Sequence, residues 1–221
     1  AGVVGGIGLV SFYRALAVGV IAVVAPITAI TSAVVPALIG FVSGDDLSVT
    51  AWIGVAVALV AVALVSGAGA GGSGSSVVER RRTPRHAIIL ALVGGLGFGL
   101  IYVGLAHTSS RAGLWPVFAM RVASIPLVAV IAGKRLLTER RHLVGRTLVL
   151  VLIGGALDNG ANAIYLLATR HGVLAAVGVI AALYPMSTVC LAFLRDHERL
   201  APGQVLGLVV AAAALTLVSL G

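Results

Sequence analysis

Long apolar stretches separated by short polar segments fill almost the whole chain. The apolar run from Ala1 to Val42 is too long for one membrane helix, because about 20 residues cross a hydrocarbon core about 30 Å thick. It therefore predicts two helices, with a turn between Arg14 and Gly19. Applied to the rest of the chain, the same criterion predicts eight spans: 1–17, 20–42, 49–67, 87–105, 114–132, 147–168, 172–194 and 203–220.

The spans are expected to be helices, because they are continuously apolar, whereas the strands of a membrane barrel alternate apolar and polar residues. Pro202 fits the first turn of the last helix, where the missing N–H of proline is harmless. Between the third and fourth spans, the Gly/Ser-rich run Ser66–Ser76 predicts a flexible linker. We expect an all-α integral membrane protein in three parts: residues 1–67, a linker at 68–86, and residues 87–221.

Composition agrees with a membrane protein. Hydrophobic residues make up 60% of the 221 residues and charged residues only 10%, whereas soluble domains carry roughly 25% charged residues. The net charge of +8 raises the alternative of nucleic-acid binding, but that function needs a folded basic face. The basic residues instead gather in short loops, where they are topology signals, so no nucleic-acid partner is expected. Eleven of the 15 lie in three loops: Arg80, Arg81, Arg82 and Arg85; Lys134, Arg135, Arg140, Arg141 and Arg146; Arg195 and Arg199.

The end of the chain repeats part of its beginning. A shift of 153 residues places 19–66 on 172–219 without a gap, with 15 of 48 positions identical. Matching spans are five apart, an odd number, so the two copies are predicted to run in opposite directions through the membrane, as in the inverted repeats of secondary transporters. The most informative matches are the non-aliphatic ones: Gly19 with Gly172, Asp45 with Glu198, Gly54 with Gly207, Ser66 with Ser219, and Tyr13 with Tyr165 after one gapped residue.

Short motifs in both copies and in the sixth span form a set that points to one family. They are Leu183, Tyr184, Pro185, Glu198, Arg199, Leu200, Gln204 and Gly207 in residues 172–220; Tyr13–Leu16, Ala25–Ile27 and Gly54 in the first copy; and Asp158, Asn162, Tyr165 and Ala168 in the sixth span. This set resembles EamA-type proteins of the drug/metabolite transporter superfamily. The likeness covers essentially the whole chain, although the motifs are loose hydrophobic patterns.

The resemblance implies a ten-helix transporter of two inverted five-helix repeats, of which this chain would hold the last eight helices. Many members of the family export amino acids or other small metabolites. The chain departs from the family pattern at Asp45 and Asp46, where a Glu-Arg pair is usual. The resemblance also implies that both chain ends are cytoplasmic, whereas the basic loops place the C-terminus outside. Orientation therefore stays open.

One acid lies in the middle of a predicted span. Asp158, Asn162 and Tyr165 are spaced i, i+4 and i+7, so one face of the sixth helix carries all three. Because an ionisable group inside a membrane is costly and usually serves a pathway, we predict a polar stripe that binds the amine of a solute, or a proton. Arg121, near the middle of the fifth span, could pair with Asp158. The alternative is a buried pair that only holds helices together.

Other residues in the spans are weaker candidates. Tyr13 and Tyr184 are predicted to line the solute cavity, or else to anchor packing through their hydroxyls. Pro26 and Pro185 are hinge candidates, because a proline inside a helix removes one hydrogen bond and invites a kink. The GxxxG pairs Gly2/Gly6 and Gly95/Gly99 predict close helix approach. Trp115, at the edge of its span, is expected to be an interface anchor.

Residues suited to catalysis or metal binding do not form a convincing site. Cys190 is the only cysteine and lies in an apolar span, which predicts a small packing residue. His107 with Ser109 and Ser110 lacks the acid partner of a hydrolase. The adjacent residues 196–198 (Asp, His, Glu) cannot easily converge on one ion. We expect no catalytic residue, no metal and no cofactor.

These observations favour a multi-pass transporter of the cell's inner membrane. Its partners would be the lipid bilayer and a small polar or amphipathic solute, such as an amino acid, moved outward by alternating access. The cavity is predicted between the first, second, sixth and seventh spans, and a homodimer is one possible assembly. Two alternatives stay open: an integral-membrane enzyme that acts on a lipid-linked substrate, and a non-transporting subunit of a membrane assembly.

Overall fold

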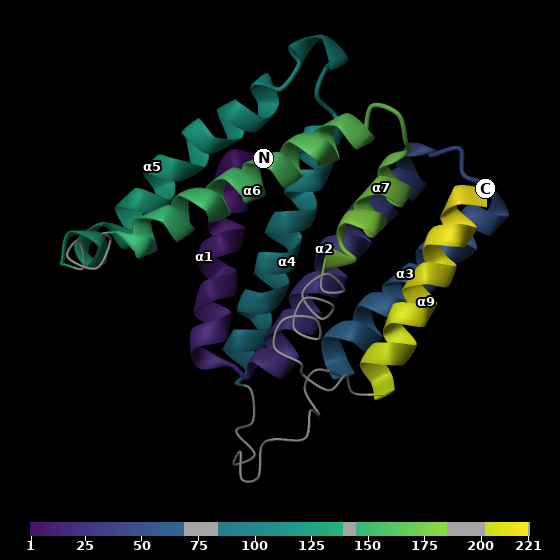
Figure 1. Cartoon of the computed structure of the whole chain (residues 1–221), viewed down its shortest axis with the longest axis horizontal. Helices are drawn as coiled ribbons and strands as arrows, with labels where there is room; N and C mark the ends of the chain where they lie inside the picture. Colours follow the sequence, from purple (N-terminus) through teal and green to yellow (C-terminus); the bar gives the residue numbers. More distant parts are fainter. Residues whose placement is uncertain (69–83, 139–144, 185–201, 221) are drawn as a thin grey trace.

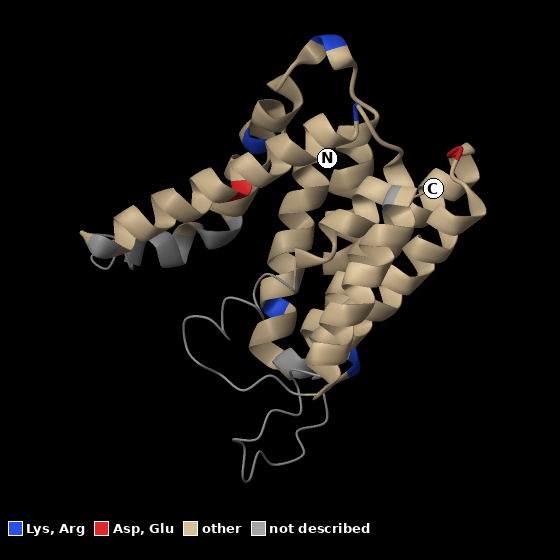
Figure 2. Ribbon diagram, turned by 45° about the vertical axis from the view of Figure 1, so that its right-hand side comes forward, with Lys and Arg blue, Asp and Glu red and all other residues tan. Residues whose placement is uncertain are grey.

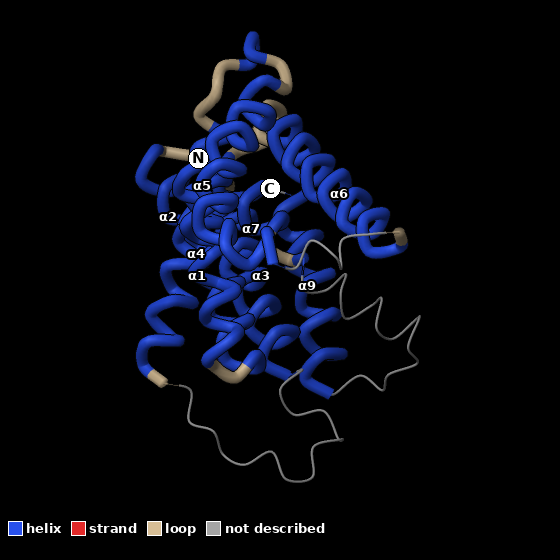
Figure 3. Tube along the Cα trace, turned by 90° about the vertical axis from the view of Figure 1, so that its left-hand side faces the viewer, coloured by secondary structure: helices blue, strands red, loops and turns tan. Residues whose placement is uncertain are grey.

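The computed structural model shows a helical protein (Figure 1). It describes all residues except 69–83, 139–144, 185–201 and 221. Within the described ranges, helices and their connecting loops make up the fold (Figure 3). The described helices are α1 (Gly2–Val18), α2 (Ile21–Ser43), α3 (Val49–Ala68), α4 (Arg85–Ala106), the 3-10 helix η2 (Ser110–Ala112), α5 (Trp115–Thr138), α6 (Arg146–Ala168), α7 (Leu174–Ala181) and α9 (Pro202–Leu220).

The predicted spans correspond to these helices, with two differences. The turn predicted between Arg14 and Gly19 is shorter, because α1 continues to Val18 and ends where the Gly19 N–H donates to the Ala15 carbonyl. Pro202 begins the last helix as predicted. The second difference is at the predicted linker, whose ends are helical, because residues 66–68 belong to α3 and Arg85 begins α4. Outside the described residues lie 69–83 of the linker, the second half of the seventh predicted span, Pro185, Cys190 and residues 196–198.

Three described helices are long and apolar enough to cross a membrane: Val23–Ser43, Arg85–Ala106 and Thr147–Ala168. Shorter apolar helices accompany them at Gly2–Val18, Val49–Val65, Trp115–Val130 and Pro202–Val218. Most described charged residues lie at or near helix ends, whereas Arg121 and Asp158 lie well inside α5 and α6 (Figure 2). The fold therefore isolates one acid and one base among apolar helices.

One part of the bundle packs through glycines. Helix α4 lies against both α1 and α2. A Cβ atom added at Gly97 would lie only 2.7 Å from the Cα of Gly8, so the backbones of α1 and α4 are in direct contact here. Both predicted GxxxG pairs also make such contacts: Gly2 and Gly6 face α5, and Gly95 and Gly99 face α2. Their predicted role in packing is confirmed.

A buried hydroxyl joins α2 to α4. The Thr28 Oγ1 lies 3.0 Å from the carbonyl oxygen of Val24 in its own helix and 3.1 Å from that of Ala91 in α4. Thr28→Val keeps the shape but loses this bond, so we expect a loss of about 0.6 kcal/mol of folding free energy, the average for such bonds in membranes. Unfolding in mixed micelles would measure it. Thr31→Val, which removes a bond within α2 only, is the control, and an equal loss would contradict an interhelical role.

Helices α3 and α9 pack on each other along their length. Gly54 of α3 faces Leu217 and Val218 of α9, and Gly207 of α9 faces Leu64 and Val65 of α3. In the alignment of the two copies Gly54 matches Gly207, and 64–65 match 217–218. The two contacts are therefore reciprocal. Buried residues from α2, from α7 and from the turn after α7 complete this side of the bundle, among them Ala29, Ala37, Val179 and Leu183.

The α5–α6 pair reaches outward beyond α1 on one side of the bundle (Figures 1 and 2). All twelve residues from Thr147 to Asp158 are exposed in α6. The C-terminal end of α6 packs on the bundle, where Tyr165 and Leu166 are buried against Leu105 of α4 and Val117 of α5. Helix α6 is thus anchored at one end, and its middle carries Asp158 on an uncovered surface.

Candidate functional site

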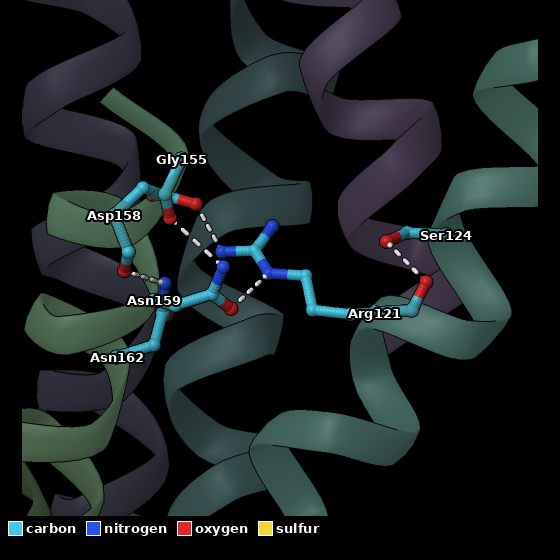
Figure 4. Close-up of polar contacts among 6 residues, drawn as sticks. All are labelled: Arg121, Ser124, Gly155, Asp158, Asn159 and Asn162. Atoms are coloured by element: carbon cyan, nitrogen blue, oxygen red, sulfur yellow. Dashed lines mark hydrogen bonds and ion pairs between the residues drawn. The ribbon is translucent and has the colours of Figure 1, made fainter. Parts of the chain in front are cut away.

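Arg121 connects α5 to α6 through two polar contacts. Its Nε donates a hydrogen bond of 2.7 Å to Asn159 Oδ1, and its Nη2 donates to Asp158 Oδ2 in an ion pair (Figure 4). The Arg121 side chain is 28% exposed and that of Asp158 is 60% exposed. The pairing predicted for Arg121 and Asp158 is therefore present, and it lies at the edge of the bundle.

Hydrogen bonds within α6 orient the amides of this site. The Asn159 Nδ2 donates to the Gly155 carbonyl, and the Asn162 Nδ2 donates to the Asp158 carbonyl, each over 2.8 Å and one turn back along the helix (Figure 4). The amide oxygen of Asn159 is consequently turned toward Arg121. Asn162 lies one turn beyond Asp158, as its spacing predicted. Asn159 was not among the predicted residues. The predicted stripe contains residues four and seven positions after Asp158, and it therefore omits the residue directly after it.

The site carries both signs of charge and still has capacity to bind. The contacts of Arg121 use two of the five N–H groups of a guanidinium, and a carboxylate can accept up to about four hydrogen bonds. An ammonium group could bind Asp158 while a carboxylate binds Arg121, because charge-assisted hydrogen bonds of this kind are roughly twice as strong as neutral ones. The arrangement suits a zwitterionic or otherwise polar solute.

Tyrosines lie on the inner side of this pair. The Tyr165 side chain is only 5% exposed, its ring centroid lies 4.5 Å from that of Tyr102 in α4, and its buried hydroxyl lacks a hydrogen-bond partner in the described part of the chain. Tyr102 lies near Asp158 and near Tyr184, a residue that follows α7 in the sequence. Tyr102 was not predicted, since a lone tyrosine in an apolar span is indistinguishable from a packing residue.

Two other predicted site residues lie elsewhere. Tyr13 of α1 is 62% exposed, and its ring packs against Phe12 of the same helix. No described contact joins it to Asp158. Pro26 is buried inside α2, where its action as a hinge stays a prediction. Trp115 begins α5 as an exposed residue and packs edge-on against Phe118, the position expected of an interface anchor.

The part of the chain that the structure describes contains no group of three or more His, Cys, Asp or Glu side chains that could hold a metal ion. Comparison with known proteins identifies a transporter family. A model of the EamA-like transporter family matches residues 81–220, which is more than half of the chain. No curated protein and no solved structure shows significant similarity to it.

Proposed function

The chain belongs to the EamA-like transporter family, and on that premise we propose that this integral membrane protein exports a small amino-acid-like or other polar or amphipathic solute. The observation that carries the proposal is the Arg121–Asp158 pair with Asn159 and Asn162, a polar site that joins the middle of α6 to the first third of α5. Ionisable groups inside apolar membrane helices usually serve a pathway. We place the protein in the inner membrane, with several spans.

We propose that the solute binds at the Arg121–Asp158 contact between α5 and α6. Its amine would contact Asp158 and Asn162, and its acidic or polar group would contact Arg121. Tyr102, Tyr165 and Tyr184 would border the inner side, where the Tyr165 hydroxyl, which has no hydrogen-bond partner among the described residues, offers a hydrogen bond to the solute or to a water molecule. Tyr13 would act from α1 only in another conformation, because it lies apart from these groups here.

We propose that the two copies form an inverted repeat and that transport proceeds by alternating access. The reciprocal contacts of Gly54 and Gly207 support a two-fold relation between α3 and α9. Helices α3 and α9, the last helices of the matched segments, run in opposite directions in the fold (Figure 1). Inverted repeats give two equivalent ways of packing, and exchange between them exposes the site to each side in turn.

The repeat also suggests what would cover α6. With the offset that pairs Tyr13 with Tyr165, Gly2 and Gly8 of α1 match Gly154 and Gly160 of α6. In α1 these glycines touch α5 and α4, whereas a Cβ atom at Gly154 or Gly160 would meet nothing within 4 Å. Two helices that stand to α6 as α4 and α5 stand to α1 would pack on this face and enclose Asp158.

Binding of a metabolite panel to the protein, scored by thermal shift, tests the proposal. A solute that raises the melting temperature of the parent but not of Asp158→Asn would support a carrier and identify the solute class. The assembly alternative predicts no stabilisation by any solute. The enzyme alternative predicts turnover of a lipid-linked substrate. Labelling of Asn162→Cys by a water-soluble maleimide separates a wet site from a sealed helix contact.

A further inference from the structure

The end of α2 is tied to the start of α7 by one acidic side chain. Asp45, in the turn between α2 and α3, accepts a hydrogen bond of 2.8 Å from the backbone N–H of Ala175 to its Oδ2. Helix α7 begins after Val173, whose side chain provides no cap. Ala175 is therefore the second helical residue, the position whose N–H an N-cap side chain normally satisfies. Asp45 supplies that cap from a segment 130 residues away.

The surrounding backbone holds Asp45 in place. The Asp45 N–H donates to the Gly40 carbonyl over 2.9 Å, and Gly44 ends α2 in the left-handed conformation with φ of 78°. Gly40 lies so close to α7 that an added Cβ atom would be 2.9 Å from Ala175. Next along the pair, Gly178 faces Pro36 at similarly short range. The α2–α7 seam, defined as Pro36, Gly40, Asp45, Ala175 and Gly178, is closed at this end.

The seam is the largest contact that α7 makes among the described helices, and its contacts with α3 and α4 are smaller. Helix α2 packs mainly on α4, and α4 in turn on α1. Helices α3 and α9 are in contact near both ends, through Gly54 and through Gly207. These contacts hold the two helices together at both ends. Apolar contacts elsewhere in the seam can slide, whereas the bond from Asp45 is directional and either forms or breaks. That bond lies at the end of the bundle where both chain termini lie (Figure 1).

We propose that Asp45 is a positioning residue that closes the α2–α7 seam, and that its release from the N-terminus of α7 lets α2 and α7 part at this end of the bundle, a movement that would serve alternating access. This inference rests on the proposed transport function only for what the opening of the seam would do in the protein. The seam and its closure can be measured without a solute, so failure of one proposal leaves the other standing.

The test measures how fast a cysteine next to the seam reacts with a small maleimide. Val179 is fully buried between α2, α3 and α9, and Val179→Cys would be made in a Cys190→Ser background, since Cys190 is the only cysteine. Adding Asp45→Ala should speed labelling about fivefold, the population change that corresponds to loss of an average N-cap. Asp45→Asn, which keeps an acceptor oxygen, should give an intermediate rate, and Asp46→Ala should match the parent.

Amide hydrogen exchange separates closure of the seam from simple capping. If Asp45 only caps α7, Asp45→Ala speeds exchange at residues 174–176 and leaves the labelling of Val179→Cys unchanged, and this result would overturn the proposal. Equal labelling in the parent, Asp45→Ala and Asp45→Asn would also overturn it. If Asp45→Ala does not fold, as shown by exchange throughout α3 and α9, the comparison of Asp45→Asn with the parent decides.

Discussion

A protein that lacks both charges of the Arg121–Asp158 pair should fold about as stably as the parent and yet bind no solute. The double variant Arg121→Leu with Asp158→Leu places apolar side chains among apolar helices, and such replacement of an ion pair is often neutral or stabilising. Solute binding should disappear, because the two groups that would hold the opposite charges of the solute are gone.

Each single variant should be less stable than the double one. Arg121→Leu leaves Asp158 without its cation, and Asp158→Leu leaves a guanidinium in the same place. Breaking a fully buried pair costs roughly 3–5 kcal/mol. The expected loss at this pair is smaller, since Asp158 is 60% exposed and solvent screens an exposed pair.

Unfolding in mixed micelles and solute binding, measured on all four proteins, complete the cycle. A pair that serves structure alone predicts that the double variant regains both stability and solute binding. A pair that serves the solute predicts recovered stability without binding. Retained solute affinity in the double variant would therefore remove Asp158 and Arg121 from the binding site.

The helices could be predicted from the sequence because lipid imposes length and apolarity on every span. Boundaries are harder to predict where the sequence lacks a break. Arg14 suggested an early end to α1, but α1 continues through it to Val18 and leaves its side chain exposed. The outward position of α6 could not be predicted either. Residues 148–153 are uniformly apolar, so their pattern does not distinguish a covered face from an open one.

At the candidate site, sequence reasoning found the charged pair but not its neighbours. A lone acid and a lone base inside spans demand an explanation, and Arg121 and Asp158 do lie together. Asn159 and Tyr102 are uncharged, so their presence inside a span requires no such explanation. They join the site through contacts between helices, the first with Arg121 and the second with Tyr165. The cap from Asp45 to Ala175 likewise depends on the meeting of two distant segments.

Gly97→Val in α4 should strongly lower the free energy of unfolding. An added Cβ atom at Gly97 would lie 2.7 Å from Gly8 Cα and 3.0 Å from the Val4 carbonyl oxygen, both of them backbone atoms that cannot rotate away. Helices α1 and α4 would have to separate. Overpacking costs about 1–3 kcal/mol and occasionally more, and we expect the upper end of that range because backbone meets backbone.

Gly133→Val in α5 is the matched control, since a Cβ atom there meets nothing within 4 Å. Equal free energies of unfolding for the two variants, measured in mixed micelles, would contradict the close approach of α1 and α4. The separation of α1 from α4 in Gly97→Val should also disturb the Arg121–Asp158 site. Gly2 of α1 packs on the carbonyl of Met120, the residue before Arg121, so a shifted α1 moves the support of the guanidinium. Gly97→Val should therefore also weaken solute binding, whereas Gly133→Val should leave it unchanged.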